Sequence, residues 1–317
     1  MTPTRMPIQT TVAVTFFYAL GYPIGNMAVN AMSPMAVLAF RFGLAGVILG
    51  SWAALAKVRW PRGRVLGHVA VTGLLMQAVQ FCALYLAIQH GAPAVLCAVV
   101  VAMNPVATAM LAAAFLKDRL TPLRVLALVL GVFAVLAACA SRLISERGVD
   151  PAVLLLLVAL VGLAAGGVYQ QRFCADVDFR ASTAVQNAVA LIPAVALTVT
   201  TPFAVHDPTK AAFAVAGVVL LNATLGVSLY VRAINLHGAA AVSMLFCVIP
   251  AVAGVLSWLM LGQRVDVGVG VGLVLGAVAC WLNSRGSRSG KKRQDDPRRD
   301  GRRQDRVEPV HQPAVAG

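Results

Sequence analysis

The sequence predicts an all-α membrane protein with ten transmembrane helices, arranged as two inverted five-helix repeats. Three observations predict this fold. First, 59% of the 317 residues are hydrophobic and only 12% are charged, whereas soluble domains are about 25% charged. Second, ten apolar runs are long enough to cross a bilayer. Third, a segment of the first half returns 145 residues later in the second half.

The ten apolar runs are separated by short polar connections. A bilayer core about 30 Å thick requires about 20 apolar residues in a helix. The first half contains runs at about 8–29, 34–56, 66–88, 93–116 and 121–142. The second half contains runs at about 151–172, 181–203, 211–233, 238–261 and 266–284. Because lipid offers no hydrogen-bond partners to the backbone, each run is expected to be a helix.

The repeat is clearest where a proline is followed by a charged stretch. Residues 104–120 contain Pro105, and the similar residues 249–265 contain Pro250. Both prolines are expected to kink their helices, because proline lacks a backbone N–H. The same offset aligns Gly21 with Gly166, Tyr85 with Tyr230, and Leu130-Gly131 with Leu275-Gly276. Glycine, proline and tyrosine matches indicate duplication better than leucine matches do in so apolar a chain.

The repeat divides the chain into a first five-helix unit at 8–142 and a second at 151–284, followed by a tail at 285–317. Five is an odd number of spans, so two consecutive units cross the membrane in opposite directions. The tail is polar and rich in Arg, Lys, Asp, Gln and Pro. This composition predicts a disordered, basic segment.

The positive charges predict the orientation. With a cytoplasmic N-terminus, the outer connections hold only four basic residues, Arg142, Arg147, Lys210 and Arg264. The inner connections then hold Arg5, Lys57, Arg59, Arg62, Arg64, Lys117, Arg119, Arg124, Arg172, Arg180 and Arg232. This bias, with the basic tail also inside, places both termini in the cytoplasm. The net charge of +14 lies in connections and the tail, so nucleic acid is not an expected partner.

The order of these features resembles that of the drug/metabolite transporter superfamily, specifically its EamA-type ten-span members. The stretches Pro105-Val106 to Leu116-Lys117-Asp118-Arg119-Leu120 and Pro250-Ala251 to Leu261-Gly262-Gln263-Arg264-Val265 are similar to the two copies of the family signature "P…FLgE.l". Ser33-Pro34 with Arg41-Phe42 resembles the family's second helix. The resemblance covers about residues 8–284 and implies an inner-membrane permease, commonly an exporter of amino acids, metabolites or drugs.

The signature departs from the family pattern at its acidic position. The usual glutamate is Asp118 in the first half and Gln263 in the second, followed by Arg119 and Arg264. No catalytic or coupling role is assigned to these four residues. They are treated as the repeat signature alone.

Arg41 is the single charged residue well inside a predicted span, because every Asp and Glu lies in a connection, at a span end or in the tail. Two readings of Arg41 are open. Its long side chain reaches back to water or pairs within the protein, or it contacts an anionic group of a substrate.

Uncharged polar residues mark the middle of the predicted spans. Gln77 lies at the centre of the third span, and Asn222 is its repeat mate in the eighth. Such residues either join helices by hydrogen bonds or line a pathway, and their symmetric placement favours the pathway. The full set of substrate-binding candidates is Arg41, Gln77, Gln80, Tyr85, Asn104, Asn222 and Tyr230, with Asn26, Gln171 and Asn187 as weaker candidates near span ends.

The sequence contains no phosphate-binding loop and no clustered metal ligands, and its six cysteines are scattered. No cofactor, metal or enzymatic activity is therefore expected. We expect a secondary transporter that exports amino acids or other small metabolites or drugs by alternating access. The substrate is expected to be neutral or zwitterionic, held by amides, with Arg41 meeting a carboxylate. Alternatives are a nucleotide-sugar or lipid-linked carrier, or a membrane scaffold or sensor that transports nothing. The oligomeric state, monomer or homodimer, stays open.

Overall fold

The computed structural model describes residues 6–116, 122–143, 151–200 and 203–262, with single positions between 267 and 282. The described chain is almost entirely helical. The first half contains α1 (Ile8–Ala31), α2 (Pro34–Leu55), α3 (Arg64–Gly73), the π-helix η1 (Leu74–Val79), α4 (Gln80–Gln89), α5 (Ala94–Val101), α6 (Asn104–Leu116) and α7 (Pro122–Leu143). The second contains α8 (Pro151–Phe173), α9 (Phe179–Thr200), α10 (Pro208–Gly217), the π-helix η2 (Val218–Val227), α11 (Ser228–His237), α12 (Ala239–Ser243), the 3₁₀-helix η3 (Met244–Cys247) and α13 (Ile249–Leu261).

The helices are suited to a membrane in length and composition. Among the described residues, seven helical stretches are long and apolar enough to cross a bilayer, and an eighth is reached if α12–η3 and α13 form one span bent by 42°. The predicted fifth span appears as the 22-residue helix α7. The predicted tenth span is described only at single positions, and the tail lies outside the described residues. The described part of the chain is thus nearly all-helical, with the length and composition of helices in a multi-pass membrane protein.

Prolines and glycines set the helix boundaries. Pro34, Pro151 and Pro208 are the first residues of α2, α8 and α10, where the missing N–H of proline costs no helical hydrogen bond. Asp207 caps α10, because its carboxylate accepts a hydrogen bond from the backbone N–H of Lys210 at 3.0 Å. That hydrogen bond lowers the pKa of Asp207. Gly262 ends α13 in the left-handed conformation, with φ 64°.

The predicted kinks at Pro105 and Pro250 are breaks between helices. A turn at Ala102 and Met103 separates α5 from α6, and Val248 separates η3 from α13. Pro105 is therefore the second residue of α6, and Pro250 the second residue of α13. Proline in the first turn of a new helix is sterically compatible, whereas it would remove a hydrogen bond within a continuous one.

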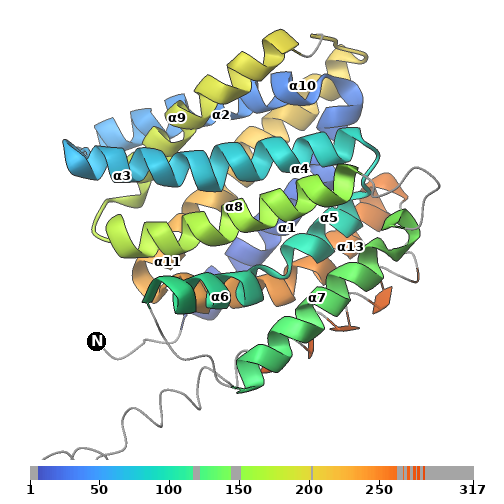
Figure 1. Ribbon diagram of the computed structural model, residues 1–317. Helices are drawn as coiled ribbons and strands as arrows, with labels where there is room; N and C mark the ends of the chain where they lie inside the picture. The colour runs from blue at the N-terminus through green and yellow to red at the C-terminus, as the bar shows by residue number, and fades with distance from the viewer. Residues whose placement is uncertain are drawn as a thin grey trace, which may run out of the picture.

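The two halves contact each other through matching pairs of helices (Figure 1). Helix α1 packs against α13 and against α10–η2 of the second half. Its repeat mate α8 packs in the same way against α6 and against α3–η1 of the first half. The mates α2 and α9 pack against one another. These contacts between the halves therefore come in pairs that the internal repeat relates to one another.

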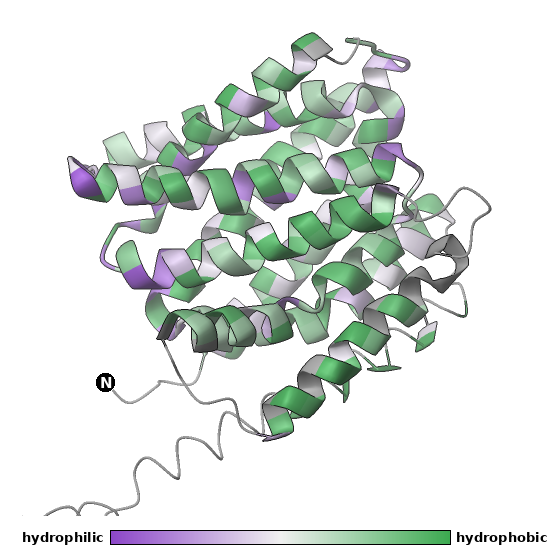
Figure 2. Ribbon diagram, in the orientation of Figure 1, coloured by the Kyte–Doolittle hydropathy of each residue, from purple (hydrophilic) through white to green (hydrophobic). Residues whose placement is uncertain are grey.

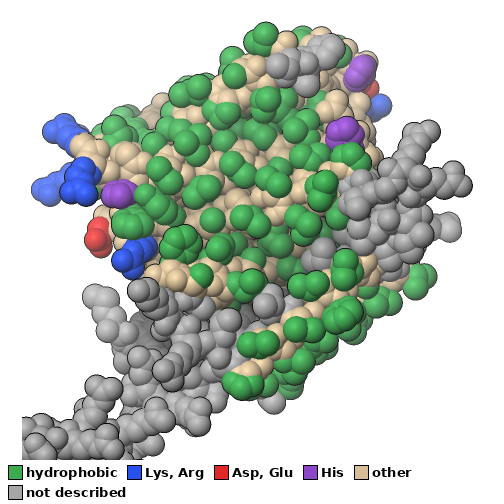
Figure 3. All heavy atoms as spheres, viewed as in Figure 1, with side chains coloured by type: hydrophobic (Ala, Val, Ile, Leu, Met, Phe, Trp, Pro, Cys, Tyr) green, Lys and Arg blue, Asp and Glu red, His purple; other side chains and the backbone are tan. Residues whose placement is uncertain are grey.

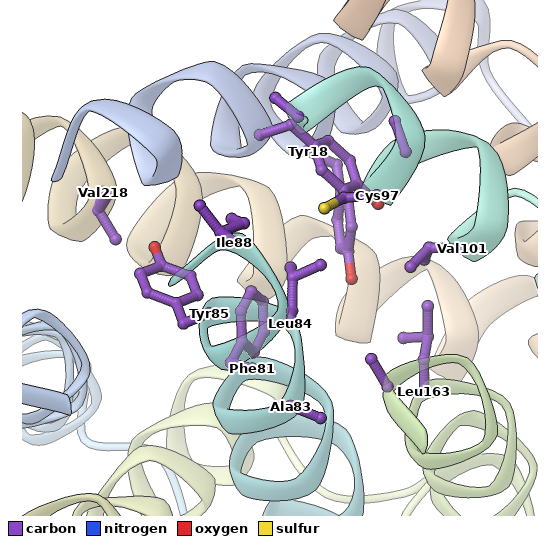
Figure 4. Packing of buried hydrophobic residues seen from close by; sticks show 14 of the residues in the cluster. Tyr18, Phe81, Ala83, Leu84, Tyr85, Ile88, Cys97, Val101, Leu163 and Val218 are labelled. Carbon is purple, nitrogen blue, oxygen red and sulfur yellow. The ribbon is translucent and has the colours of Figure 1, made fainter. Parts of the chain in front are cut away.

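The protein interior is apolar and formed by both halves. Helix α5 is buried along its whole length, and Figure 4 shows how Cys97 from this helix packs near Tyr18 of α1 and Leu84 of α4. Hydropathy colouring shows that hydrophilic residues concentrate at the helix ends, with few between them (Figure 2). Large hydrophobic side chains such as Leu55, Ile192 and Val199 are exposed on the outside, as expected of a surface that faces lipid.

The two ends of the helical bundle differ in charge and chemistry. Lys and Arg gather at one end, which we call the basic end (Figure 3). Its exposed members include Lys57, Arg59, Arg62, Arg64, Arg172 and Arg232. Arg180 at this end pairs with Asp178 at 2.9 Å, and the hydrogen bond to Arg180 lowers the pKa of Asp178.

The opposite end is closed by backbone hydrogen bonds between the halves. The Ser33 N–H donates to the Ala204 carbonyl at 2.9 Å, and the His206 N–H donates to the Ala31 carbonyl at 2.8 Å. These bonds flank an antiparallel bridge between Met32 and Val205. We call this feature the backbone bridge. It joins the α1–α2 connection to the α9–α10 connection.

Candidate functional site

The third helix of each repeat contains a π-helical segment at mid-length. These segments are Leu74–Val79 and Val218–Val227, and they overlap when the sequence is shifted by the repeat offset. A π-helical turn is wider than an α-helical turn and frequently occurs at functional sites. The first segment carries Gln77 and the second carries Asn222. Gln77 and Asn222, the pair predicted from the repeat, thus lie on the two π-helical segments of the described chain.

Arg41 joins the two segments. It lies in α2 and is completely buried, with 0% of its surface exposed. One Nη1 N–H donates to Gln77 Oε1 at 3.4 Å, and one Nη2 N–H donates to Asn222 Oδ1 at 3.4 Å. The ring of Phe81 covers the guanidinium at 3.6 Å. The side chain therefore points into the protein and does not reach water, but it does pair within the protein, as the first of the two open readings allowed.

Two glycines allow the helices to approach the π-helical segments this closely. A Cβ at Gly21 of α1 would lie 2.7 Å from Cγ of Asn222, and a Cβ at its mate Gly166 of α8 would lie 2.9 Å from Cβ of Met76. Real side chains do not tolerate such distances. Gly21 and Gly166, which the repeat offset aligns, therefore make equivalent contacts. In each contact, the first helix of one repeat approaches the third helix of the other.

A second polar layer lies beside Arg41. Gln80 donates from Nε2 to the hydroxyl of Tyr18 at 2.7 Å. Asn104 donates from Nδ2 to the hydroxyl of Tyr230 at 3.4 Å. The rings of Tyr18 and Tyr230 meet each other edge to face, with centroids 5.5 Å apart. Phe246 packs against both rings. This layer combines three candidates, from α4, α6 and α11, with Tyr18 of α1, which the sequence does not single out.

The Tyr18–Gln80 hydrogen bond gives a stability prediction. We expect Tyr18→Phe to lower the free energy of unfolding by about 1–3 kcal/mol, because it leaves the buried amide of Gln80 without its acceptor. Thermal unfolding of the purified protein in detergent would measure this loss. Tyr22→Phe is the matched control, since the buried Tyr22 hydroxyl has no hydrogen-bond partner. Equal losses in the two variants would contradict the assignment.

The remaining candidates make no hydrogen bond to Arg41 within the described chain, although Tyr85 is close enough to interact with its charge. Tyr85 is buried in α4, and its hydroxyl lies close to Gly25 of α1. Asn26 accepts from Asn30 at 3.1 Å. Gln171 accepts from the Ala239 N–H at 2.8 Å, and Asn187 donates to the Thr183 carbonyl at 2.8 Å. The last two therefore bind backbone groups. The signature residues Asp118, Arg119, Gln263 and Arg264 lie outside the described residues.

Sequence reasoning missed a buried cluster near the basic end, which we call the amide cluster. It consists of Gln170, Gln186 and Asn235. Gln186 donates from Nε2 to Gln170 Oε1 at 3.0 Å, and Gln170 donates from Nε2 to Asn235 Oδ1 at 2.9 Å. A signal was available, because Gln186 is the repeat mate of Arg41. The cluster joins α8, α9 and α11.

The site has no acidic counterpart in the described chain. Its three described carboxylates, Asp176, Asp178 and Asp207, all lie in connections between helices. Asp178 and Asp207 pair with Arg180 and Lys210 there. No cluster of His, Cys, Asp and Glu suited to a metal ion occurs among the described residues. The arrangement offers a buried cation, amides, hydroxyls and aromatic faces, which suits binding of a solute.

Comparisons with known proteins agree with this architecture. A model of the EamA-like transporter family matches residues 6–139 and again residues 150–285. A solved structure titled "Crystal structure of protein" is similar with a TM-score of 0.62 and 16% sequence identity, covering 87% of this chain and 97% of its own. At that identity the likeness shows a shared fold alone. No curated protein matches the chain.

Proposed function

Because the chain belongs to the EamA-like transporter family, whose model covers both halves, we propose that it is a secondary transporter of small organic metabolites. In this proposal ten spans form two inverted repeats, and the repeats rock against each other to expose a central site to each side in turn. The basic end faces the cytoplasm of the cell, in accordance with the charge bias of the connections. Amino acids and similar small metabolites or drugs are the proposed substrates, and export is the proposed direction.

One observation carries the proposal. Arg41 of the first repeat binds Gln77 of its own repeat and Asn222 of the other, at mid-depth in the bundle. A polar group buried inside a membrane protein is costly and marks a pathway more often than a simple packing contact. A site assembled from both repeats changes its access when the repeats move relative to one another.

A transport assay tests the proposal directly. Purified protein is reconstituted in liposomes, and uptake of labelled amino acids is compared with that of nucleotide sugars and hydrophobic cations. We expect counterflow of at least one small metabolite that protein-free liposomes do not show. Preferential movement of nucleotide sugars would favour the carrier alternative, and absence of any movement would favour a static scaffold.

Labelling of single cysteines tests alternating access. We expect Gln77→Cys and Asn222→Cys each to react with a membrane-impermeant thiol reagent added from either side, above the background of the native cysteines. Leu74→Cys is the matched control, because Leu74 lies in the same π-helical segment with 43% of its surface exposed on the lipid-facing side. Protection of both test positions from both sides would contradict the mechanism.

A further inference from the structure

The charge of Arg41 is not neutralised by any described residue. A guanidinium remains protonated in proteins, and the three described carboxylates, Asp176, Asp178 and Asp207, lie in connections between helices. The two amide oxygens that contact Arg41 lie at 3.4 Å, longer than the 2.7–2.9 Å typical of hydrogen bonds between charged groups. A buried charge without a close counter-charge is strongly unfavourable. The positive charge of Arg41 therefore lacks a negatively charged partner within the described chain.

The free hydrogen-bonding groups next to this charge are donors. Arg41 Nε and Gln77 Nε2 are buried and have no hydrogen-bond partner. The assignment of the Gln77 amide follows from its neighbour, since a guanidinium only donates and so must face the amide oxygen. Two unpartnered N–H donors beside one positive charge require an acceptor that is negatively charged.

Charge and shape narrow the class of anion. Arg41 is the only fully buried Lys or Arg side chain among the described residues, so the site balances one negative charge. Phe81 covers one face of the guanidinium at 3.6 Å, which leaves its edge as the place for a ligand. The two oxygens of a carboxylate match two parallel N–H groups at that edge. A phosphate group, with up to two negative charges, would leave excess charge buried.

A buried positive charge at this position occurs in the first repeat and not in the second, where the repeat mate of Arg41 is Gln186. Gln186 is neutral, and its amide already donates to Gln170 and to Ser182, each at 3.0 Å. Only the first repeat thus carries a charged residue at this position of its second helix. Binding of an anion is expected on the Arg41 side of the midplane.

We propose that Arg41, assisted by Gln77, binds the carboxylate of a substrate that carries a single negatively charged group, which assigns the substrates to zwitterionic amino acids and short monocarboxylic acids. This assignment rests on the proposed transport function. The carboxylate accepts hydrogen bonds from the unpartnered Arg41 Nε and Gln77 Nε2 groups, while the contacts of Arg41 with Gln77 and Asn222 hold the guanidinium in place. Because the Arg41 guanidinium is the one positive charge that holds the carboxylate, the substrate dissociates again when the site opens to one side of the membrane.

A binding experiment tests the assignment without relying on transport. Thermal unfolding of the full chain in detergent is followed with amino acids and monocarboxylic acids, each compared with its own carboxamide at equal ionic strength. We expect at least one acid to stabilise the protein with an affinity about tenfold or more above that of its carboxamide. In Arg41→Gln this preference should be lost, and in Arg41→Lys it should be weakened, because lysine cannot form a bidentate pair. Arg62→Gln, in the exposed α2–α3 connection, should retain the preference.

Each outcome decides the assignment. Equal stabilisation by acids and carboxamides, or an acid preference that persists in Arg41→Gln, would overturn it. Stabilisation by chloride as strong as that by any acid would show an adventitious anion site and also overturn it. Arg41→Lys keeps the charge, so it decides the question if Arg41→Gln does not fold. Transport of solutes in liposomes without any acid preference would leave the transporter proposal standing while this assignment fails.

Discussion

Gly21→Ala is expected to lower the transport rate at subsaturating substrate by about 10- to 100-fold. An added Cβ would lie 2.7 Å from Cγ of Asn222, so the Asn222 amide must move away from Arg41. Loss of one hydrogen bond to a charged group costs about 1.5–3 kcal/mol, and each 1.4 kcal/mol corresponds to a factor of ten. Initial rates of counterflow in liposomes would measure the effect.

Gly254→Ala is the control for this prediction. Gly254 is a buried glycine in α13, and a Cβ there would meet no atom within 4 Å. The variant should transport at the parental rate, since alanine is also favoured over glycine within a helix. Equal transport by both variants would show that the approach of α1 to Asn222 is not required.

Gly73→Ala is expected to be the most destabilising of the small substitutions. An added Cβ would lie 2.7 Å from Cα and 2.9 Å from the carbonyl oxygen of Gln186. These are backbone atoms, so α3 and α9 must separate. Overpacking of this kind costs about 1–3 kcal/mol. Thermal unfolding in detergent should show a clearly lowered melting temperature.

Gly67→Ala on the same helix provides the comparison. A Cβ at Gly67 meets no atom within 4 Å, so alanine should raise stability by about 0.5–1 kcal/mol through its helix propensity. If both variants melted at the same temperature, the close packing of α3 on α9 would not contribute to stability.

Much of the fold could be predicted, because hydrophobic runs and a fixed repeat offset are properties of the sequence itself. The membrane-spanning character and the two-repeat organisation follow from them, and the family match covers both halves. The π-helical segments could not be predicted, because a wide turn at Leu74–Val79 leaves no mark in an already apolar run. The sequence predicts only kinks at Pro105 and Pro250, where the structure has breaks. A proline alone does not distinguish a bend within one helix from the first turn of a new helix.

The candidate site was only partly predictable. The pairing of Gln77 with Asn222 followed from the repeat, and Arg41 stood out as a charge within a span. Their meeting depends on packing between α2 and the two third helices, for which the sequence holds no signal. Tyr18 and Phe81 were missed because an aromatic residue in an apolar run has the same appearance whether it faces lipid or a guanidinium.

The backbone bridge and the amide cluster differ in how easily mutation can remove them. The bridge uses the N–H groups of Ser33 and His206, which every amino acid except proline supplies, so most substitutions there leave its hydrogen bonds intact. The amide cluster depends on three particular side chains, Gln170, Gln186 and Asn235, and one nucleotide change can abolish each. Sequence drift should therefore be tolerated at the bridge, whereas single substitutions in the amide cluster should break its hydrogen bonds.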